Sequence, residues 1–561
     1  MQNSRASHFK SRAGCRTCKR RRIKCDEIKP CCIRCLSGNR ICEGYGIVID
    51  APKRPTSKII KIQKAKGHAN SWSEIQPKVM TTLDVIPFLN HSESAAFDLF
   101  RSQTIREMSG LRSSNFWKKI ALPACYSVPA ILHASMALAS AGRWSQASRK
   151  GYHPLGSDLM KLDTVHYYNK AIQHLKIHVA KHGDLSSLKI SLIACILFIA
   201  LELSTGRFGQ ALMHLNQGRK LLHTTSSSKL SAKCDSKVST KTARLLSSFH
   251  STEDEIVSVF ADLDLQATYF GSERPQLTLG SHSSAEIHGP KSQFSLALPK
   301  HFSFMQEANQ YLVIITNKCL QFVGQELDHD QHTRQNESSN FHRQYLYKTL
   351  KDWRKRYKEI CSKAVVSDSS DTWKQYSSLM CLHHTWLSIV LPTSYAETEE
   401  TDFDSYFREF ATIVDLANSI LSEDASKRLS LEFGLVAPLS WTVKNCRHPQ
   451  IRRKALHLLT QAGREGLWEP RLMTQLGREL ILLEEGIEKL EYLDLHAERS
   501  YGDEDLVPLE RRISTVSVSL EIGEHPELCI TFQRKAWSYG QCIGMETIIR
   551  RQPYESLLPE E

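Results

Sequence analysis

The sequence predicts a two-part protein, in which a small cysteine-rich module precedes a large domain built almost wholly of helices. Seven of the sixteen cysteines lie within residues 14–42. Positive charge is concentrated in the same region, because residues 1–66 hold eighteen Lys and Arg against four Asp and Glu, which leaves 55 against 56 for the rest of the chain. From about residue 83 onward, apolar residues recur at intervals of three and four, which indicates amphipathic helices.

The chain length and the apolar runs limit the class of protein. A chain of 561 residues is too long for a single core, so we expect at least two folded units. The first fifteen residues hold no apolar stretch of the kind found in signal peptides, which argues against secretion. The longest apolar run covers only residues 190–201, short of the ~20 residues that span a bilayer. We therefore expect a buried core helix there, no membrane partner, and cysteines that bind metal rather than form disulfides.

Six of the seven clustered cysteines follow one duplicated spacing. Each half is a Cys-x2-Cys pair followed, after six intervening residues, by a third cysteine; the six are Cys15, Cys18, Cys25, Cys32, Cys35 and Cys42. Tetrahedral zinc takes four ligands, so three thiolates per half fall one short. Six thiolates complete the four-fold coordination of two zinc ions per chain if one thiolate from each half bridges both metals. The alternative is a set of free buried thiols or a redox cluster.

Cys31 stands directly before Cys32 and does not fit this spacing. With Cys31 as the ligand, the second Cys-x2-Cys pair would be lost, whereas Cys32 preserves both. We therefore predict that Cys31 binds no metal.

A basic run, "KRRRIK" at residues 19–24, fills the first six-residue gap. Cys18 and Cys25 are seven residues apart, close to two helical turns, so a short helix between them would carry positive charge on the side away from the metals. Such a helix suits the DNA major groove, where Arg or Lys binds guanine. The alternative is a run that binds phosphate or serves nuclear import without contacting bases.

The cysteine spacing, the basic run and Pro30 before Cys32 closely resemble the fungal binuclear zinc cluster (Zn2Cys6) family of transcription factors. The resemblance implies a small domain of two short helix-loop halves, with Cys15 and Cys32 as the bridging thiolates. It also implies recognition of CGG-like triplets through base contacts from Arg21 and Arg22, where family members commonly have lysine. We expect phosphate contacts from Arg16, Lys19, Arg20 and Lys24.

The long remainder resembles the fungal-specific transcription factor regulatory domain over residues 83–497. The resemblance rests on "VIPFLNHSESAAFDLFRSQTI", the helices of residues 168–222, "DLDLQATYFG" and "FGLVAPLSWTVKNCRHPQIRRKALHLLTQAGREGLWEP". It implies an all-α regulatory body. Within the first of these helices we expect a buried stripe of Val165, Tyr168, Ile172, Leu175 and Val179.

The complete predicted division of the chain has five parts. They are a basic disordered arm (1–11), the zinc-cluster domain (12–46), a basic flexible linker (47–82), the helical regulatory domain (83–497) and a C-terminal tail (498–561) in which "STVSVSL" and "ELCITF" could pair as a β-hairpin. The linker holds no heptad run long enough for a coiled coil, so the sequence leaves homodimerisation open.

These features predict a nuclear, zinc-dependent regulator of RNA polymerase II transcription. Its partners would be double-stranded DNA and the transcription machinery or co-regulators, and the family resemblance suggests metabolic or secondary-metabolite target genes. The alternative is a chromatin or co-repressor scaffold that contacts DNA without sequence preference. No catalytic motif is found, so we predict no enzyme activity. We expect His383 and His384, beside Cys381, to be partly exposed helix residues rather than metal ligands.

Overall fold

The computed structural model describes two compact units, within residues 1–78 and 79–561. In the first unit it describes residues 17–18, 21, 23, 25–26 and 33–37. In the second it describes residues 90–111, 115–149, 157–182, 185–228, 252–268, 275–277, 296–328, 337–364, 371–394, 399–421, 429–488, 506–521, 527–538 and 541–553. The predicted arm (1–11) and linker (47–82) lie outside these residues.

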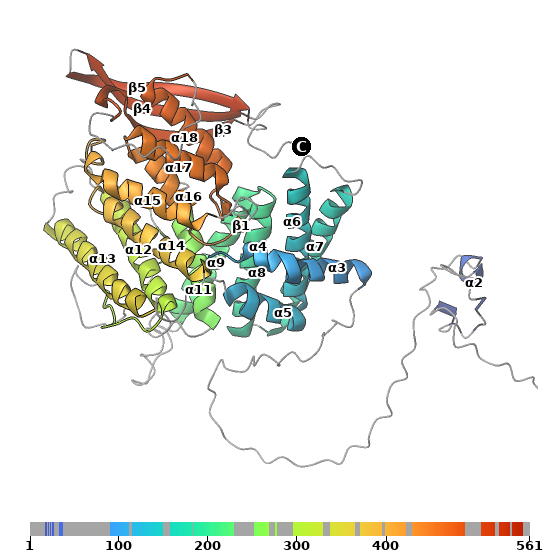
Figure 1. Ribbon diagram of the computed structural model, residues 1–561. Coiled ribbons are helices and arrows are strands. Elements are labelled where there is room, and N and C mark those ends of the chain that lie inside the picture. The colour runs from blue at the N-terminus through green and yellow to red at the C-terminus, as the bar shows by residue number, and fades with distance from the viewer. Residues whose placement is uncertain are drawn as a thin grey trace, which may run out of the picture. The chain divides into compact units, whose positions relative to one another are not determined.

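The second unit begins with a bundle of helices (Figure 1). Asn90 starts the first of them with a capping box, because its side chain accepts a bond from the Glu93 amide at 2.8 Å while its own amide donates to Glu93 at 3.2 Å. The elements are α3 (His91–Leu99), η1 (Phe100–Thr104), α4 (Ile105–Met108), η2 (Phe116–Ala121), α5 (Leu122–Ser127), α6 (Pro129–Arg149), α7 (Ser157–His182), α8 (Leu185–Ser204) and α9 (Phe208–Ser228).

Helix α8 lies at the centre of this bundle, as the apolar run predicted. Its Ser187–Ser204 stretch is long and apolar enough to cross a membrane by composition, yet 78% of it is buried inside the unit. Ile193, Leu197 and Leu201 are at most 1% exposed and belong to one hydrophobic core cluster with residues of α6 and α9. Helix α8 is therefore a core helix of this unit.

Helix α7 buries a face that only partly matches the predicted stripe. Tyr168, Ile172 and Leu175 are partly buried against the core as expected, but Val165 and Val179 are 53% and 43% exposed. Tyr167 and Ala171 are buried instead. The buried face is thus turned toward the residues directly before the predicted ones, where α7 packs against α6.

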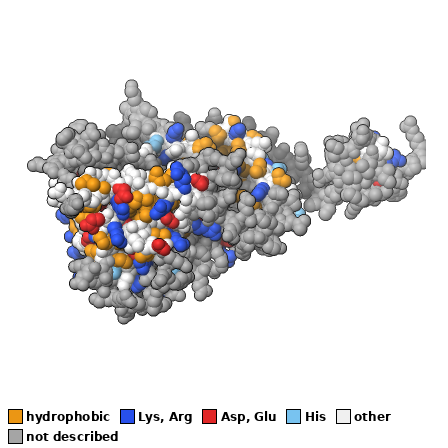
Figure 2. All heavy atoms as spheres, turned by 90° about the horizontal axis from the view of Figure 1, so that it is seen from above, with side chains coloured by type: hydrophobic (Ala, Val, Ile, Leu, Met, Phe, Trp, Pro, Cys, Tyr) orange, Lys and Arg blue, Asp and Glu red, His pale blue; other side chains and the backbone are white. Residues whose placement is uncertain are grey.

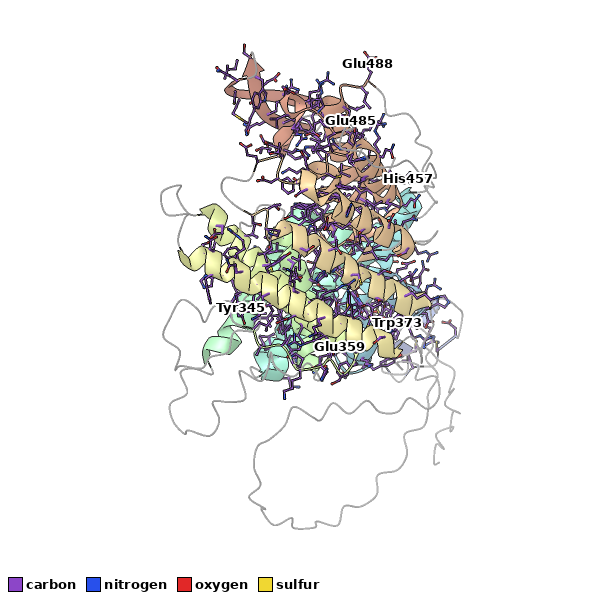
Figure 3. All side chains as sticks on the ribbon, turned by 60° about the vertical axis from the view of Figure 1, so that its left-hand side comes forward. Tyr345, Glu359, Trp373, His457, Glu485 and Glu488 are labelled. Atoms are coloured by element: carbon purple, nitrogen blue, oxygen red, sulfur yellow. The ribbon has the colours of Figure 1, made fainter. Side chains whose placement is uncertain are left out.

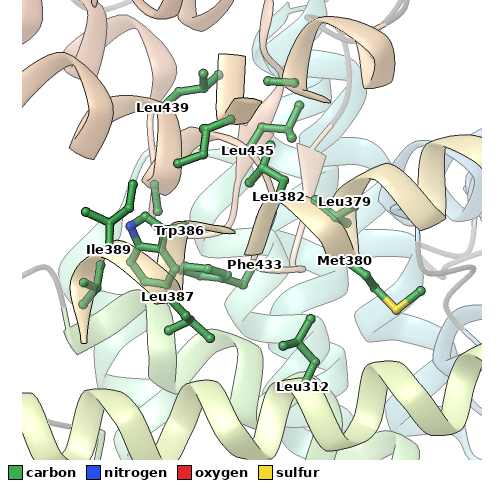
Figure 4. Packing of buried hydrophobic residues seen from close by; sticks show 14 of the residues in the cluster. Leu312, Leu379, Met380, Leu382, Trp386, Leu387, Ile389, Phe433, Leu435 and Leu439 are labelled. Atoms are coloured by element: carbon green, nitrogen blue, oxygen red, sulfur yellow. The ribbon is translucent and has the colours of Figure 1, made fainter. Parts of the chain in front are cut away.

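The second half of the unit forms a second core. Its helices are α11 (Thr252–Thr268), α12 (Met305–Asp328), α13 (Glu337–Ala364), α14 (Asp371–Val390), the short η4 (Asp404–Tyr406), α15 (Phe407–Ile420), α16 (Val436–Asn445), α17 (Pro449–Gln461) and α18 (Pro470–Glu485). Trp386 of α14 is fully buried at the middle of this cluster, beside Phe433 and Leu387 (Figure 4). Fully burying such large apolar side chains contributes about 1.5–3 kcal/mol each.

Helix α13 also fixes a neighbouring irregular segment through Tyr345 and Glu359, which Figure 3 labels. The Tyr345 hydroxyl accepts from the Leu296 amide at 3.0 Å and donates to the Leu296 carbonyl at 3.1 Å. Glu359 contacts His301 Nδ1 at 3.0 Å. Segment 296–301 is thereby held along α13 by polar contacts at both of its ends.

Helix α11 joins the two cores. Its Phe260 and Leu263 pack in the first cluster, whereas Ala261 and Leu265 pack in the second. Its buried polar side chains bind both sides as well. Asp264 forms a buried ion pair with Arg219 of α9, and Gln266 bonds the Leu431 carbonyl and the Leu467 amide, both at 2.9 Å. These bonds supply partners to buried polar groups, which would otherwise destabilise the folded protein.

The prediction of an all-α body for residues 83–497 is wrong at one point, and the β-hairpin predicted for the end of the chain is extended by a further strand. A two-stranded parallel pair, β1 (Leu429–Ser430) and β2 (Arg464–Glu465), lies among the helices. The predicted hairpin forms from β3 (Ile513–Glu521) and β4 (Glu527–Ser538), but a third strand, β5 (Gln541–Pro553), extends it into an antiparallel sheet of order β3-β4-β5.

The sheet packs on helix α18 (Figure 1), with the short η7 (Leu509–Arg511) preceding β3. Leu528, Ile530 and Phe532 alternate along β4 and meet Leu480 of α18 and Ile513 of β3. A period of two with one buried face is the pattern of a half-buried strand. Part of the predicted C-terminal tail thus shares a core with the helical domain.

Candidate metal centre and nucleic-acid interface

The described part of the N-terminal unit brings thiols from both cysteine repeats together. Cys18 and Cys35 are fully buried, and Cys25 is 6% exposed. Among the described residues, one apolar side chain, that of the partly buried Ile23, packs against these thiols. The Cys18 and Cys35 Sγ atoms lie 3.8 Å apart. Zinc–sulfur bonds of 2.3 Å in a tetrahedron place two sulfurs about 3.8 Å apart, so this spacing fits thiolates gathered at a metal centre.

Two short helical segments position these thiols. In the first half, Thr17 and Cys18 are helical, and the Arg21 amide donates to the Thr17 carbonyl at 3.1 Å. In the second half, α2 (Ile33–Leu36) carries Cys35. This agrees with the expectation of two helix-loop halves as far as the described residues extend.

The halves are also tied by a bond that the sequence analysis did not predict. The Asp26 carboxylate accepts from the Arg34 amide at 2.9 Å, in the first turn of α2. Orphan amides at a helix start favour an acidic partner, so the bond stabilises the second half against the first. The signal in the sequence was the acidic pair Asp26 and Glu27, which directly follows Cys25 within an otherwise basic stretch.

Arg21 is exposed, one helical turn beyond the buried Thr17 and Cys18. Its side chain is therefore available to a partner in solution. The other predicted DNA contacts lie outside the described residues; they are Arg16, Lys19, Arg20, Arg22 and Lys24. Three of the predicted zinc ligands, Cys15, Cys32 and Cys42, also lie outside them, as does Cys31. Within the described part of the chain, no three His, Cys, Asp or Glu side chains form a complete metal site.

The cysteine and histidines near residue 383 do not converge. His383 is buried rather than partly exposed as predicted, with Nε2 2.9 Å from the Gly434 carbonyl oxygen, whereas His384 is partly exposed. Cys381 accepts from Arg354 at 2.8 Å, and His384 stacks on Trp353 with ring centroids 5.7 Å apart. Each side chain has a separate structural contact, so these three residues build no common site.

The two units therefore define a class of protein that joins a cysteine-rich module, whose described thiols fit a metal centre, to a large and mainly helical body. The model of the fungal Zn(2)-Cys(6) binuclear cluster domain matches residues 13–50. That of the fungal specific transcription factor domain matches residues 95–395, more than half of the chain. The chain belongs to the fungal transcription factors that carry a binuclear zinc cluster, and it is a transcription regulator rather than an enzyme.

Curated relatives agree with this assignment. The chain is 33% identical over 224 residues to the aspercryptin biosynthesis cluster-specific transcription regulator atnN of Emericella nidulans, a match that covers 38% of this chain and 35% of the relative. It is 27% identical over 214 residues to the transcription regulator lscL of Purpureocillium lilacinum, which covers 36% and 47%. These matches thus span between a third and a half of the relatives' lengths.

A much shorter match is closer in sequence. The transcriptional regulatory protein moc3 of Schizosaccharomyces pombe is 61% identical over 36 residues, 6% of this chain and 7% of the relative. No solved structure matches the chain.

Proposed function

We propose that this chain is a nuclear, zinc-dependent, sequence-specific DNA-binding regulator of RNA polymerase II transcription. The observation that carries the proposal is the burial of Cys18 and Cys35 at van der Waals distance, with Arg21 exposed one turn away. A module this small has too few apolar residues for a core, so its fold depends on the metal that the thiols bind.

Six cysteines are proposed as the ligands of two zinc ions: Cys15, Cys18, Cys25, Cys32, Cys35 and Cys42. When bound, zinc supplies folding energy and holds both halves in place. Six thiolates and two Zn²⁺ sum to a charge of −2, which the neighbouring Lys and Arg offset. This arrangement lets a dense basic segment fold, since the thiolates neutralise part of its self-repulsion.

Base contacts are proposed for Arg21 and Arg22, in the major groove of a CGG-like triplet. The planar guanidinium matches O6 and N7 of guanine, so arginine binds this base in two places. Phosphate contacts from Arg16, Lys19, Arg20 and Lys24 would fix the register of the helix on the duplex. The net charge of +14 over residues 1–66 strengthens attraction to DNA at any sequence.

Genes of a biosynthetic pathway are the proposed targets. The match to a regulator specific to the aspercryptin biosynthesis cluster supports a secondary-metabolite gene cluster, and this match extends well beyond the zinc module because it spans 224 residues. The helical unit would then bind co-regulators or the transcription machinery.

The test is selection of bound sites from random DNA by the full chain loaded with zinc. A recovered CGG-like triplet supports the proposal. Recovery of no preferred sequence, together with DNA binding that is uniform over all sequences, would instead favour a chromatin or co-repressor scaffold. Repeating the selection after chelation separates zinc-dependent recognition from binding by the basic segment alone.

A further inference from the structure

Strand β5 lies at the edge of the C-terminal sheet. The order β3-β4-β5 leaves it hydrogen-bonded to β4 along one side only, among the strands that the structure describes. It is 13 residues long. A long edge strand presents a row of free amide and carbonyl groups, which is a template for pairing with another strand.

Among the described residues, the bulge and the proline that interrupt this edge lie near its ends. A bulge interrupts the pairing between Trp537 and Ala536, opposite Cys542 and Gly544, and Pro553 ends the strand. Between Met545 and Pro553, the register with β4 is unbroken. Natural edges usually carry bulges, prolines or inward charges to prevent pairing, so the regular stretch from 545 to 552 stays available.

Apolar side chains are exposed along the same strand. Ile543, Met545 and Ile549 are 69%, 57% and 49% exposed. Seen from above, where the sheet tops the unit, hydrophobic side chains stand among both basic and acidic ones (Figure 2). A mixed surface of this kind does not suit a polyanion; it suits a protein strand with matching apolar and charged positions.

The charged residues of β5 indicate that the partner strand is β5 of a second copy of this chain. Antiparallel pairing about a two-fold axis at Ile548 places Glu546 opposite Arg550 of the second copy, and the symmetry repeats this pair. Within one chain, Glu546 already accepts from Arg534 of β4 at 2.7 Å, so each carboxylate would lie between two guanidinium groups. A shift of the axis to Thr547 would place Glu546 opposite Ile548 and lose both ion pairs.

We propose that two copies of this chain associate through their β5 strands, in antiparallel register about Ile548, and so join two three-stranded sheets into one. This supplies a dimer interface in a chain whose linker sequence holds no heptad run long enough for a coiled coil. If the proposed function holds, the dimer carries two zinc-cluster domains and would bind two DNA half-sites.

The test is sedimentation of the full chain, without DNA, over a wide range of protein concentration. The unmodified chain is expected to be a dimer. In the Arg550→Glu variant, Glu546 of each copy faces a glutamate at position 550 of the other copy, so this variant should be monomeric. Arg478→Glu makes the same charge change at an exposed position of α18 and should leave the dimer intact. Circular dichroism of each variant checks that the sheet and helices are retained.

A mixture of two variants with exchanged charges distinguishes loss of the interface from misfolding of a variant. Glu546→Arg alone should also yield monomers, whereas an equal mixture of Glu546→Arg and Arg550→Glu chains restores both ion pairs and should form heterodimers. A monomeric unmodified chain, a dimeric Arg550→Glu variant, or a mixture that stays monomeric would each overturn the proposal. Because no DNA is present, these outcomes do not depend on the proposed function.

Discussion

The Sγ atoms of Cys18 and Cys35 lie 3.8 Å apart although the two residues are separated by 17 positions in the sequence. One cysteine comes from each half of the duplicated motif, so this contact is the point at which the halves meet. In the proposed function, zinc held by these thiols is what stabilises so small and basic a module. Changes that remove a metal ligand should therefore unfold the module, whereas changes beside a ligand should not.

Replacement of Cys35 with Ser should lower bound zinc below two ions per chain and abolish specific DNA binding, since zinc contributes on the order of 10 kcal/mol to modules of this kind. Replacement of Cys31 with Ser is the matched control and should leave two ions bound. Metal analysis of the purified chains and binding to the selected DNA site measure both effects. One zinc ion in the Cys31→Ser variant would show that Cys31 is a ligand.

Arg22→Ala should weaken binding to the selected site by about 1–3 kcal/mol while leaving binding to unrelated DNA nearly unchanged, because a base contact discriminates between sequences. Lys19→Ala should weaken both kinds of binding and reduce the salt dependence, as expected for a phosphate contact. Titrations with both DNAs at several salt concentrations distinguish the roles. An equal loss on both DNAs for Arg22→Ala would remove this residue from base recognition.

Arg219→Met should destabilise the helical unit by about 3–5 kcal/mol, because it leaves the buried Asp264 carboxylate without its cation. The exposed fractions of the two side chains are 8% and 0%. The control is Arg101→Met, which breaks an ion pair with Asp98 whose side chains are 39% and 64% exposed, and should cost less than about 1 kcal/mol. Urea unfolding measures the free energy of unfolding of each variant. Equal losses of this free energy for the two variants would mean that the burial of the Arg219–Asp264 pair does not increase its contribution to stability.

The sequence predicted the features of this chain that depend on patterns of residue type. The cysteine spacing identified the zinc module, and the continuous apolar run at residues 190–201 identified α8 as a core helix. The alternation of Val516 and Val518 with serines, and of Ile530 and Phe532, predicted the hairpin of β3 and β4. In each case the signal is a local pattern of residue types, which can be recognised without knowledge of tertiary contacts.

Other features depend on tertiary contacts and gave no such signal. Asp264 and Gln266 of α11 are polar and would ordinarily indicate a solvent face, yet both are fully buried because Arg219 and two backbone groups bind them. Strand β5 was missed because its side chains are mostly exposed on both faces, which removes the alternation that marks a half-buried strand. Its existence depends on pairing with β4.

His384 should make the helical unit sensitive to acid. Burial, reinforced by the nearby Arg354, lowers the pKa of His384 to about 4, from an ordinary value of 6.5. Between these pH values the unfolded chain binds the proton and the folded chain does not. The free energy of unfolding should therefore fall as the pH drops from 6.5 toward 4, by at most about 1.4 kcal/mol per pH unit from this group.

His384→Phe keeps an aromatic ring beside Trp353 and removes the titrating group, so its stability should fall less steeply over the same pH range. His223→Phe, at an exposed position of α9, is the control and should follow the unmodified chain. Eight of the nine tryptophans follow residue 83 and the ninth, Trp72, lies in the predicted linker, so changes of fluorescence during urea unfolding report mainly on the helical unit and not on the zinc module. Identical pH profiles for His384→Phe and the unmodified chain would mean that protonation of His384 does not oppose folding.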